Sequence, residues 1–238
     1  MGLRMQGKLQ EIVNRLVEAH GENLVSVILH GSAVAASRNR PPADFQLLVV
    51  TESLSALDIK RARAAMKWWE MSGFPRATWF TKKEFLNSLD VFPIEFRQMQ
   101  RSYRVLAGED LLANVVVSKL NLRLLTEYEL RGKLLRLRAL YLAASDDPEQ
   151  VTRLITDSVV SFVQYLRPVL ELVGEEAPLG RLATVRRLGE QLQIETAPLE
   201  RALRLRDESV DLLDMEVQDL FASYLTCLEQ VIEAVDRI

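Results

Sequence analysis

The sequence holds few of the residues from which disulfide frameworks and cysteine-based metal centres are built. Its 238 residues include one cysteine, Cys227, and two histidines. A single cysteine excludes an internal disulfide and a cysteine-based zinc site, and it fits a reducing compartment. We therefore expect a cytoplasmic protein of bacterial type.

The sequence also lacks a strong net charge and a long apolar run. Lys and Arg number 30 against 33 Asp and Glu, which gives a formal net charge of −3. Binding to nucleic acid usually needs a basic face, so this balance makes nucleic acid an unexpected partner. No apolar stretch reaches the roughly 18 residues that cross a bilayer, and the first residues lack the apolar core of a signal peptide. We expect no association with membranes.

What the sequence does have is a first half in which helix and strand patterns alternate. Leu9, Ile12 and Leu16 fall on one face of a helix, and Gly21 stands where a left-handed cap would end it. Short apolar runs that follow predict buried strands, with helices between them. The predicted strands are residues 24–29, 45–50, 76–80 and 91–96, and the predicted helices between them are 56–71 and 82–88.

The predicted helix over 56–71 has recognisable ends and a recognisable inner face. Ser55 can cap its first turn, and Gly73 lies just beyond its last turn. Its apolar positions are expected to point inward, and these are Ile59, Ala62, Met66 and Trp69.

The second half has a helical pattern throughout. Residues 111–144 are rich in Leu and Arg, with only Gly132 as a breaker, and predict one or two long helices. Asp147 and Pro148 form an N-cap followed by proline at the first helical position. Further helices are expected from there to about 173 and over 181–192, 198–207 and 211–236. The fold class is therefore α+β: a mixed sheet with flanking helices over residues 1–110, then an all-α bundle of four or five helices over 111–238.

The segment between the first two predicted strands carries the candidate chemistry. It reads HGSAVAASRNRPPADFQLLVV, residues 30–50. Gly31 allows close approach of the backbone, and Ser32 adds a hydroxyl donor for a phosphate. Asp44 and Gln46 are two residues apart on a strand, so both side chains leave the same face. Two ligands of one metal ion need this geometry.

This arrangement resembles the signature of the polymerase-beta-like nucleotidyltransferases, over roughly residues 20–100. The helical second half is compatible with the bundle that follows this domain in kanamycin-nucleotidyltransferase-like bacterial proteins. The resemblance implies that Gly31 and Ser32 hold the phosphates of a nucleoside triphosphate such as ATP. It also implies a divalent metal site, with Mg²⁺ as one ion or a pair, that uses two acidic residues spaced by one and a third acid on a neighbouring strand. Asp44 and Gln46 occupy the first two places, and Glu95 is expected in the third, with Asp90 as the runner-up.

Two basic residues are weaker candidates for the nucleotide. Arg38 lies in the loop between the Gly-Ser turn and the second strand, from which it could reach a phosphate. The resemblance implies that a basic residue of the bundle approaches the triphosphate, and Lys133 is the choice for that role. Solvated charges on a loop and on a helix face are the alternative reading of both residues.

Gln46 decides between the functional hypotheses. An amide oxygen can bind a metal, but it removes one negative charge from a site for a hard cation. Losing one well-placed electrostatic group from a catalytic site costs about 3–4 kcal/mol. The first hypothesis is a nucleotidyltransferase that moves a nucleoside monophosphate to a hydroxyl or protein acceptor. The second is a nucleotide-binding protein without turnover, and the third is an interaction protein whose helical half pairs with itself or with a partner.

Overall fold

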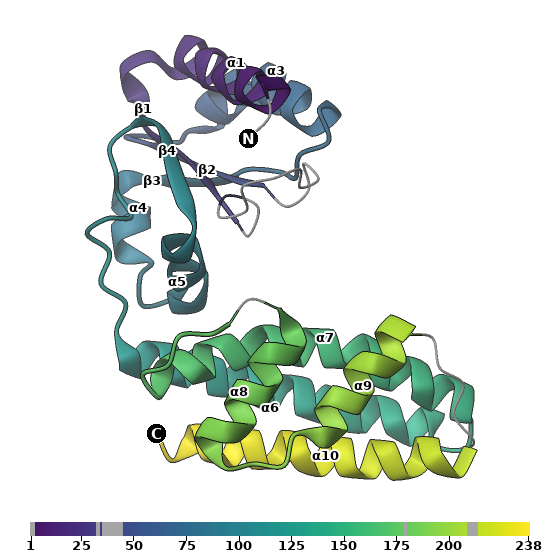
Figure 1. Ribbon diagram of the computed structural model, residues 1–238. Coiled ribbons are helices and arrows are strands. Elements are labelled where there is room, and N and C mark those ends of the chain that lie inside the picture. Colours follow the sequence, from purple (N-terminus) through teal and green to yellow (C-terminus); the bar gives the residue numbers. More distant parts are fainter. Residues whose placement is uncertain (1–2, 32–33, 35–44, 179, 209–213) are drawn as a thin grey trace. The chain divides into compact units, whose positions relative to one another are not determined.

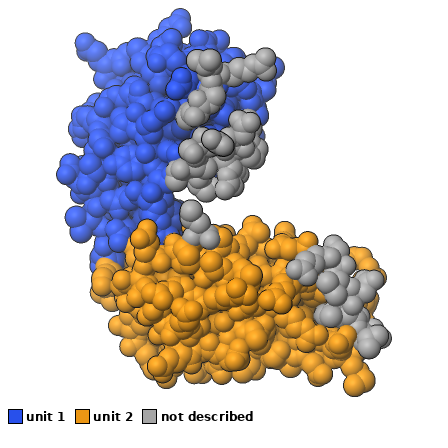
Figure 2. Space-filling model, viewed as in Figure 1, with its two compact units in different colours: residues 1–118 blue, residues 119–238 orange. Residues whose placement is uncertain are grey.

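The computed structural model describes residues 3–31, 34, 45–178, 180–208 and 214–238. It divides into two compact units, Met1–Ser118 and Lys119–Ile238 (Figure 2). The first unit is a sheet with helices on both faces, and the second is helical (Figure 1). The α+β class expected from the sequence is confirmed. Among the described residues, no helix is both long and apolar enough to cross a membrane.

The sheet of the first unit is mixed, with strand order β3-β2-β1-β4. β1 (Leu24–His30) lies between β2 (Gln46–Thr51) and β4 (Tyr103–Gly108) and is antiparallel to both. β3 (Thr78–Thr81) runs parallel to β2. The mixed sheet and its first two strands agree with the sequence prediction.

β1 and β2 are buried on both faces, so their side chains alternate between two cores. Leu29 and Leu47 belong to the core beneath α1 and α3. Ile28 and Leu48 belong to the opposite core, which includes Phe85 of α4 and Phe96 of α5. Figure 1 shows α1 and α3 together on one side of the sheet. The helices of this unit are α1 (Leu3–His20), the short 3-10 helix η1 (Gly21–Asn23), α3 (Ala56–Met71), α4 (Lys82–Asn87) and α5 (Pro93–Arg101).

The helix α3 begins with a complete capping box. The Asp58 N–H donates to Ser55 Oγ (3.3 Å), and the Ser55 N–H donates to the Asp58 carboxylate (2.9 Å). The buried positions are Asp58, Ala62, Ala65 and Trp69. The predicted inward position of Ile59 is wrong, because this side chain is 57% exposed. The buried stripe starts at the capping residue Asp58, which the count of apolar residues overlooked.

The predicted strand over 91–96 is also wrong. Pro93 starts the helix α5, at a position where the missing N–H of proline costs nothing. Ile94, Phe96 and Met99 of that helix are buried. The last strand is instead β4, whose sequence YRVLAG carries Arg104 in its interior and so shows no continuous apolar run.

The second unit is a helical bundle. Tyr141 and Phe221 stack with ring centroids 3.9 Å apart, and the hydroxyls of Ser158 and Tyr224 lie 3.1 Å apart within the core. The predicted cap is confirmed, since Asp147 accepts a hydrogen bond from the Gln150 N–H (3.1 Å). The helices of the described part are α6 (Lys119–Ala144), α7 (Pro148–Leu172), α8 (Arg181–Leu192), α9 (Ala197–Glu208) and α10 (Asp214–Asp236).

The segment just before the bundle is not helical, although the Leu-rich pattern predicted a helix from residue 111. The long helix α6 begins at Lys119. Leu112 and Val115 are buried in the core of the first unit, beside α5. Their apolar character therefore reflects packing against the sheet layer rather than a helical face.

The end of β4 depends on a glycine. Gly108 has a φ of +78°, and it pairs with Ser26 near the start of β1. A Cβ added at Gly108 would lie 1.9 Å from the carbonyl oxygen of Val25, which is backbone and cannot move aside. Both the backbone conformation and the available space therefore require glycine there.

We expect Gly108→Ala to lower the free energy of unfolding by about 3 kcal/mol, through backbone strain and the clash with Val25. Gly7→Ala is the matched control, because nothing lies within 4 Å of a Cβ at that helical position. Alanine there is expected to raise stability by about 0.5–1 kcal/mol. Urea unfolding of both variants measures the difference in their free energies of unfolding. Equal values would contradict the requirement for glycine at position 108.

Candidate functional site

The candidate site lies at one end of the two central strands, where the last residue of β1 pairs with the first residue of β2. We call this end of the strand pair the β1–β2 edge. His30, the last residue of β1, pairs with Gln46 of β2 on one side and with Tyr103 of β4 on the other. Gly31 follows with a φ of +113°, and its N–H donates to the carbonyl oxygen of Ser102 (3.2 Å). The chain thus turns at the glycine that the sequence singled out.

His30 and Gln46 project from the same face of the sheet. They continue the alternation of Ile28 and Leu48, whose side chains enter the core shared with α4 and α5. Gln46 is exposed, whereas His30 is only 5% exposed. A ligand at this edge could therefore contact the amide directly, with the imidazole packed beside it.

Two buried polar atoms at this edge lack a hydrogen-bond partner among the described residues. They are Nε2 of His30 and Oγ of Ser102. Buried polar atoms in proteins are nearly always hydrogen-bonded, so a pair of orphaned atoms flanking one turn indicates a place for a polar ligand or water. Ser102 was not a candidate in the sequence, because it precedes a strand that the apolar pattern did not reveal.

The imidazole of His30 is uncharged at neutral pH. Burial lowers its pKa to about 4, because a buried site disfavours the protonated form. His30 can therefore donate or accept a hydrogen bond, but it adds no positive charge for a phosphate.

The described part of this edge fits a divalent metal poorly. The strands β1, β2, β3 and β4 carry no Asp or Glu in their described sequences. No group of three or more His, Cys, Asp or Glu side chains among the described residues could hold a metal ion. Gln46 supplies one neutral oxygen, whereas hard divalent cations prefer carboxylates.

The other predicted site residues fall into two groups. Ser32, Arg38 and Asp44 lie outside the described residues. Glu95 is exposed in the first turn of α5, so its predicted place on a strand is wrong, and the residues of the true last strand carry no acid. Lys133 belongs to α6 in the second unit, where its Nζ lies 5.0 Å from the centroid of the Tyr165 ring. That contact is a cation–π interaction within the bundle.

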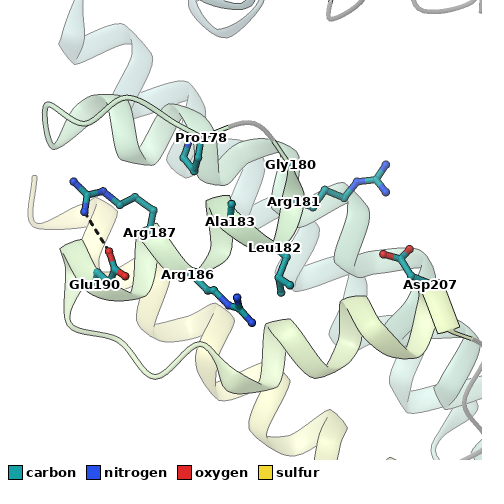
Figure 3. A pocket seen from close by; sticks show the side chains of 9 residues that line it. All are labelled: Pro178, Gly180, Arg181, Leu182, Ala183, Arg186, Arg187, Glu190 and Asp207. Atoms are coloured by element: carbon teal, nitrogen blue, oxygen red, sulfur yellow. Dashed lines mark hydrogen bonds and ion pairs between the residues drawn. The ribbon is translucent and has the colours of Figure 1, made fainter. Parts of the chain in front are cut away.

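A hollow lies in the bundle, at the start of α8, among residues that the sequence did not single out (Figure 3). It has a volume of about 870 Å³ and three arginines at its walls. Arg186 pairs with Glu200 (3.0 Å), and Arg187 pairs with both Glu175 (2.6 Å) and Glu190 (3.2 Å). These carboxylates neutralise most of the arginine charge, so the hollow is a weak candidate for binding an anion. Its lining residues are Pro178, Gly180, Arg181, Leu182, Ala183, Arg186, Arg187, Glu190 and Asp207.

The lowered pKa of His30 predicts a stability that depends on pH. The unfolded chain binds a proton at this histidine below about pH 6.5, and the folded chain does so only near pH 4. The contribution of His30 to the free energy of unfolding is therefore fully present above pH 6.5. It falls by about 3 kcal/mol as the pH drops toward 4. Burial also lowers the pKa of His20, in the same direction.

We expect His30→Gln to flatten the pH dependence of the free energy of unfolding between pH 6.5 and 4. Denaturant unfolding at several pH values measures it, with His20→Gln as the control for the other histidine. Because the chain has two histidines, NMR titration of the imidazoles assigns each pKa directly. A His30 signal that titrates near pH 6.5 would rule out the buried neutral form.

Comparison with known proteins agrees with this architecture. No protein-family model and no curated protein matches the chain. Among solved structures, the chain is similar to spectinomycin adenyltransferase AAD(9) from Enterococcus faecialis, solved with ATP and spectinomycin. The sequences are 14% identical, the TM-score is 0.52, and the match covers 94% of this chain and 99% of that chain. At this identity the likeness concerns the fold, and the fold of this chain is nucleotidyltransferase-like.

Proposed function

We propose that this chain binds a nucleoside triphosphate with Mg²⁺ at the β1–β2 edge and acts as a nucleotide-binding protein rather than as an efficient transferase. In this proposal the turn at Gly31 and Ser32 holds phosphate oxygens. Asp44 and Gln46 contact the metal that accompanies the nucleotide.

The observation that carries the proposal is the pairing of His30 with Gln46 at the strand ends. This pairing places an exposed amide next to the Gly31 turn, and the orphaned buried atoms of His30 and Ser102 belong to the same turn and the neighbouring segment. A glycine turn beside unpaired polar groups suits a polar ligand such as a triphosphate. The similar adenyltransferase was solved with ATP, which supports the choice of nucleotide.

The argument against efficient transfer is electrostatic. Nucleotidyl transfer relies on divalent ions held by carboxylates, which clamp the attacking and leaving oxygens. Gln46 is neutral, and the described strands contribute no other acid. With Asp44 as the one acid of the motif, the site holds less negative charge than two clamped ions need, so Mg²⁺ would be held largely by the triphosphate itself.

Transfer of a nucleoside monophosphate to a hydroxyl or protein acceptor is the second candidate function. It is favoured by the acid retained at Asp44 and by the fold shared with an adenyltransferase. Under this alternative Gln46 would replace a carboxylate ligand, and Glu95 would supply the third. Arg38 is a proposed contact of the triphosphate under either function.

We expect millimolar Mg-ATP to raise the Tm of the wild-type protein. A ligand at ten times its Kd stabilises the folded state by about 1.4 kcal/mol, which is measurable by thermal unfolding. Asp44→Ala should abolish the Mg²⁺-dependent part of the shift, and Gln46→Asp should enlarge it. If neither wild type nor Gln46→Asp shifts with Mg-ATP, the site does not bind nucleotide.

The same variants separate binding from transfer. With labelled ATP and a broad panel of hydroxyl acceptors, we expect wild type to remain at the level of Asp44→Ala. Restoring a carboxylate with Gln46→Asp should raise transfer by about 10²–10³-fold, the usual effect of one electrostatic group. Wild-type transfer well above Asp44→Ala would favour the second candidate. Glu95→Gln then shows whether the carboxylate on α5 joins the metal, since only a ligand would lower the Mg²⁺-dependent shift.

A further inference from the structure

The helix α6 has an apolar face that nothing in the described bundle covers. Its inner face is buried, at positions such as Leu130, Leu134 and Leu137. On the opposite face Tyr128, Leu135 and Leu142 are 72%, 64% and 81% exposed. Isolated exposed leucines are ordinary, but a row of them along one helix indicates an interaction surface.

The exposed residues form a regular stripe. They follow one another at intervals of three or four residues, which places them on a single side of the helix over about 27 Å. From Tyr128 onward, small residues alternate with large ones, and a Cβ at Gly132 would meet nothing within 4 Å. We call this set the α6 stripe, and its members are Leu124, Tyr128, Gly132, Leu135, Ala139 and Leu142.

The α6 stripes of two copies of the chain fit each other when the two helices are antiparallel. A two-fold axis between residues 133 and 134 brings Gly132 opposite Leu135 and brings Ala139 opposite Tyr128. Each of the central large side chains, Tyr128 and Leu135, then meets a small one, which allows the two helices to approach closely. At the two ends of the pair, Leu124 of one copy lies near Leu142 of the other. A parallel arrangement would place Tyr128 against Tyr128 and Leu135 against Leu135, with no small residue opposite them.

The charges beside the stripe have the same symmetry. Glu129 and Arg136 lie on the same flank of α6, and neither has a hydrogen bond or ion pair within the described residues. In an antiparallel pair, a given flank of one helix faces the same flank of the other, so Glu129 of one copy approaches Arg136 of the second. On the other flank, Arg131 and Arg138 already pair with Glu127 and Glu229 of their own chain.

We propose that a second copy of this chain covers the α6 stripe, with the two α6 helices antiparallel and Glu129 of each paired with Arg136 of the other. A second copy is the expected partner because both the sizes of the facing side chains and their charges match about one two-fold axis. Binding to a different protein would not require that symmetry. A contact of one helix from each copy is at the small end of specific interfaces. We expect a dissociation constant in the micromolar range, about 1–100 μM.

Light scattering or sedimentation of the full chain over this concentration range tests the association. We expect a monomer–dimer equilibrium that Leu135→Glu moves to monomer, because two buried carboxylates would face Gly132 of the partner. Ile59→Glu is the matched control, since Ile59 is 57% exposed but lies on α3 of the first unit. Circular dichroism melting confirms that both variants fold. A wild-type monomer at 200 μM (about twice the weakest expected constant) overturns the proposal.

A charge reversal tests the proposed pairing. Glu129→Arg and Arg136→Glu should each weaken dimerisation at least tenfold, since each places like charges opposite one another. The double variant restores opposite charges across the axis and should recover most of the affinity. A double variant as weak as the single ones would reject this ion pair and the register that it defines.

Cross-linking through introduced cysteines tests the direction of the helices. In the antiparallel pair, the two copies of residue 135 lie about 4.5 Å apart along the axis, and those of residue 124 lie about 28 Å apart. A short bis-maleimide should therefore link Leu135→Cys and not Leu124→Cys. The native Cys227 is buried, and burial raises its pKa to about 12, so it should not react. Linking at both positions would show parallel helices, because every residue of the stripe then faces its own copy.

Discussion

The register between β1 and β2 is the constraint on which the first unit depends. Both strands are covered on both faces, so a shift by one residue would send the side chains of each core into the other, where the neighbouring helices are not shaped to fit them. The same register sets His30 opposite Gln46 and leaves Gly31 to turn away at the edge. The same strand pairing that holds the two cores therefore also forms the candidate site. It is the place where a doubly buried strand pair ends, with Gln46 exposed to solvent beside the buried His30.

The chemistry of the β1–β2 edge follows from the lack of acidic side chains on the four described strands. Among its described residues, an exposed amide, a neutral imidazole and a serine hydroxyl offer hydrogen bonds, and the four strands add no carboxylate that would concentrate cations. Hydrogen bonds at a rigid edge can hold and orient an anion that arrives with its own metal. They cannot supply the charge that stabilises a transferring phosphoryl group, which is the physical reason for separating binding from turnover.

Most of the fold could be predicted from the sequence, and the exceptions share one cause. Where apolar residues repeat at a helical or strand interval over many positions, as in α1, β1 and β2, the predicted elements are confirmed. Around Pro93 the apolar residues are few, and the sequence PIEF suits a strand as well as a first helical turn. The packing of Phe96 and Met99 beneath the sheet decides the outcome, and no local pattern contains that information.

The site was predicted less completely than the fold. Gly31 and Gln46 could be found from a local motif, and the structure places them at adjacent strand ends. Glu95 was chosen only through the misassigned strand, and Ser102 comes to this edge because β4 pairs with β1. Contributions from distant segments depend on strand order, which the sequence does not state directly.

The position of β4 in the chain has a consequence for how this protein is made. Ser26 of β1 bonds to the carbonyl of Glu109, which lies 83 residues further along the chain. During synthesis, one side of β1 therefore stays unpaired until the ribosome has released almost the whole first unit. A nascent chain with such an open strand is exposed to wrong pairing with its neighbours. Codon choice and chaperone supply over that interval should therefore influence the yield of folded protein.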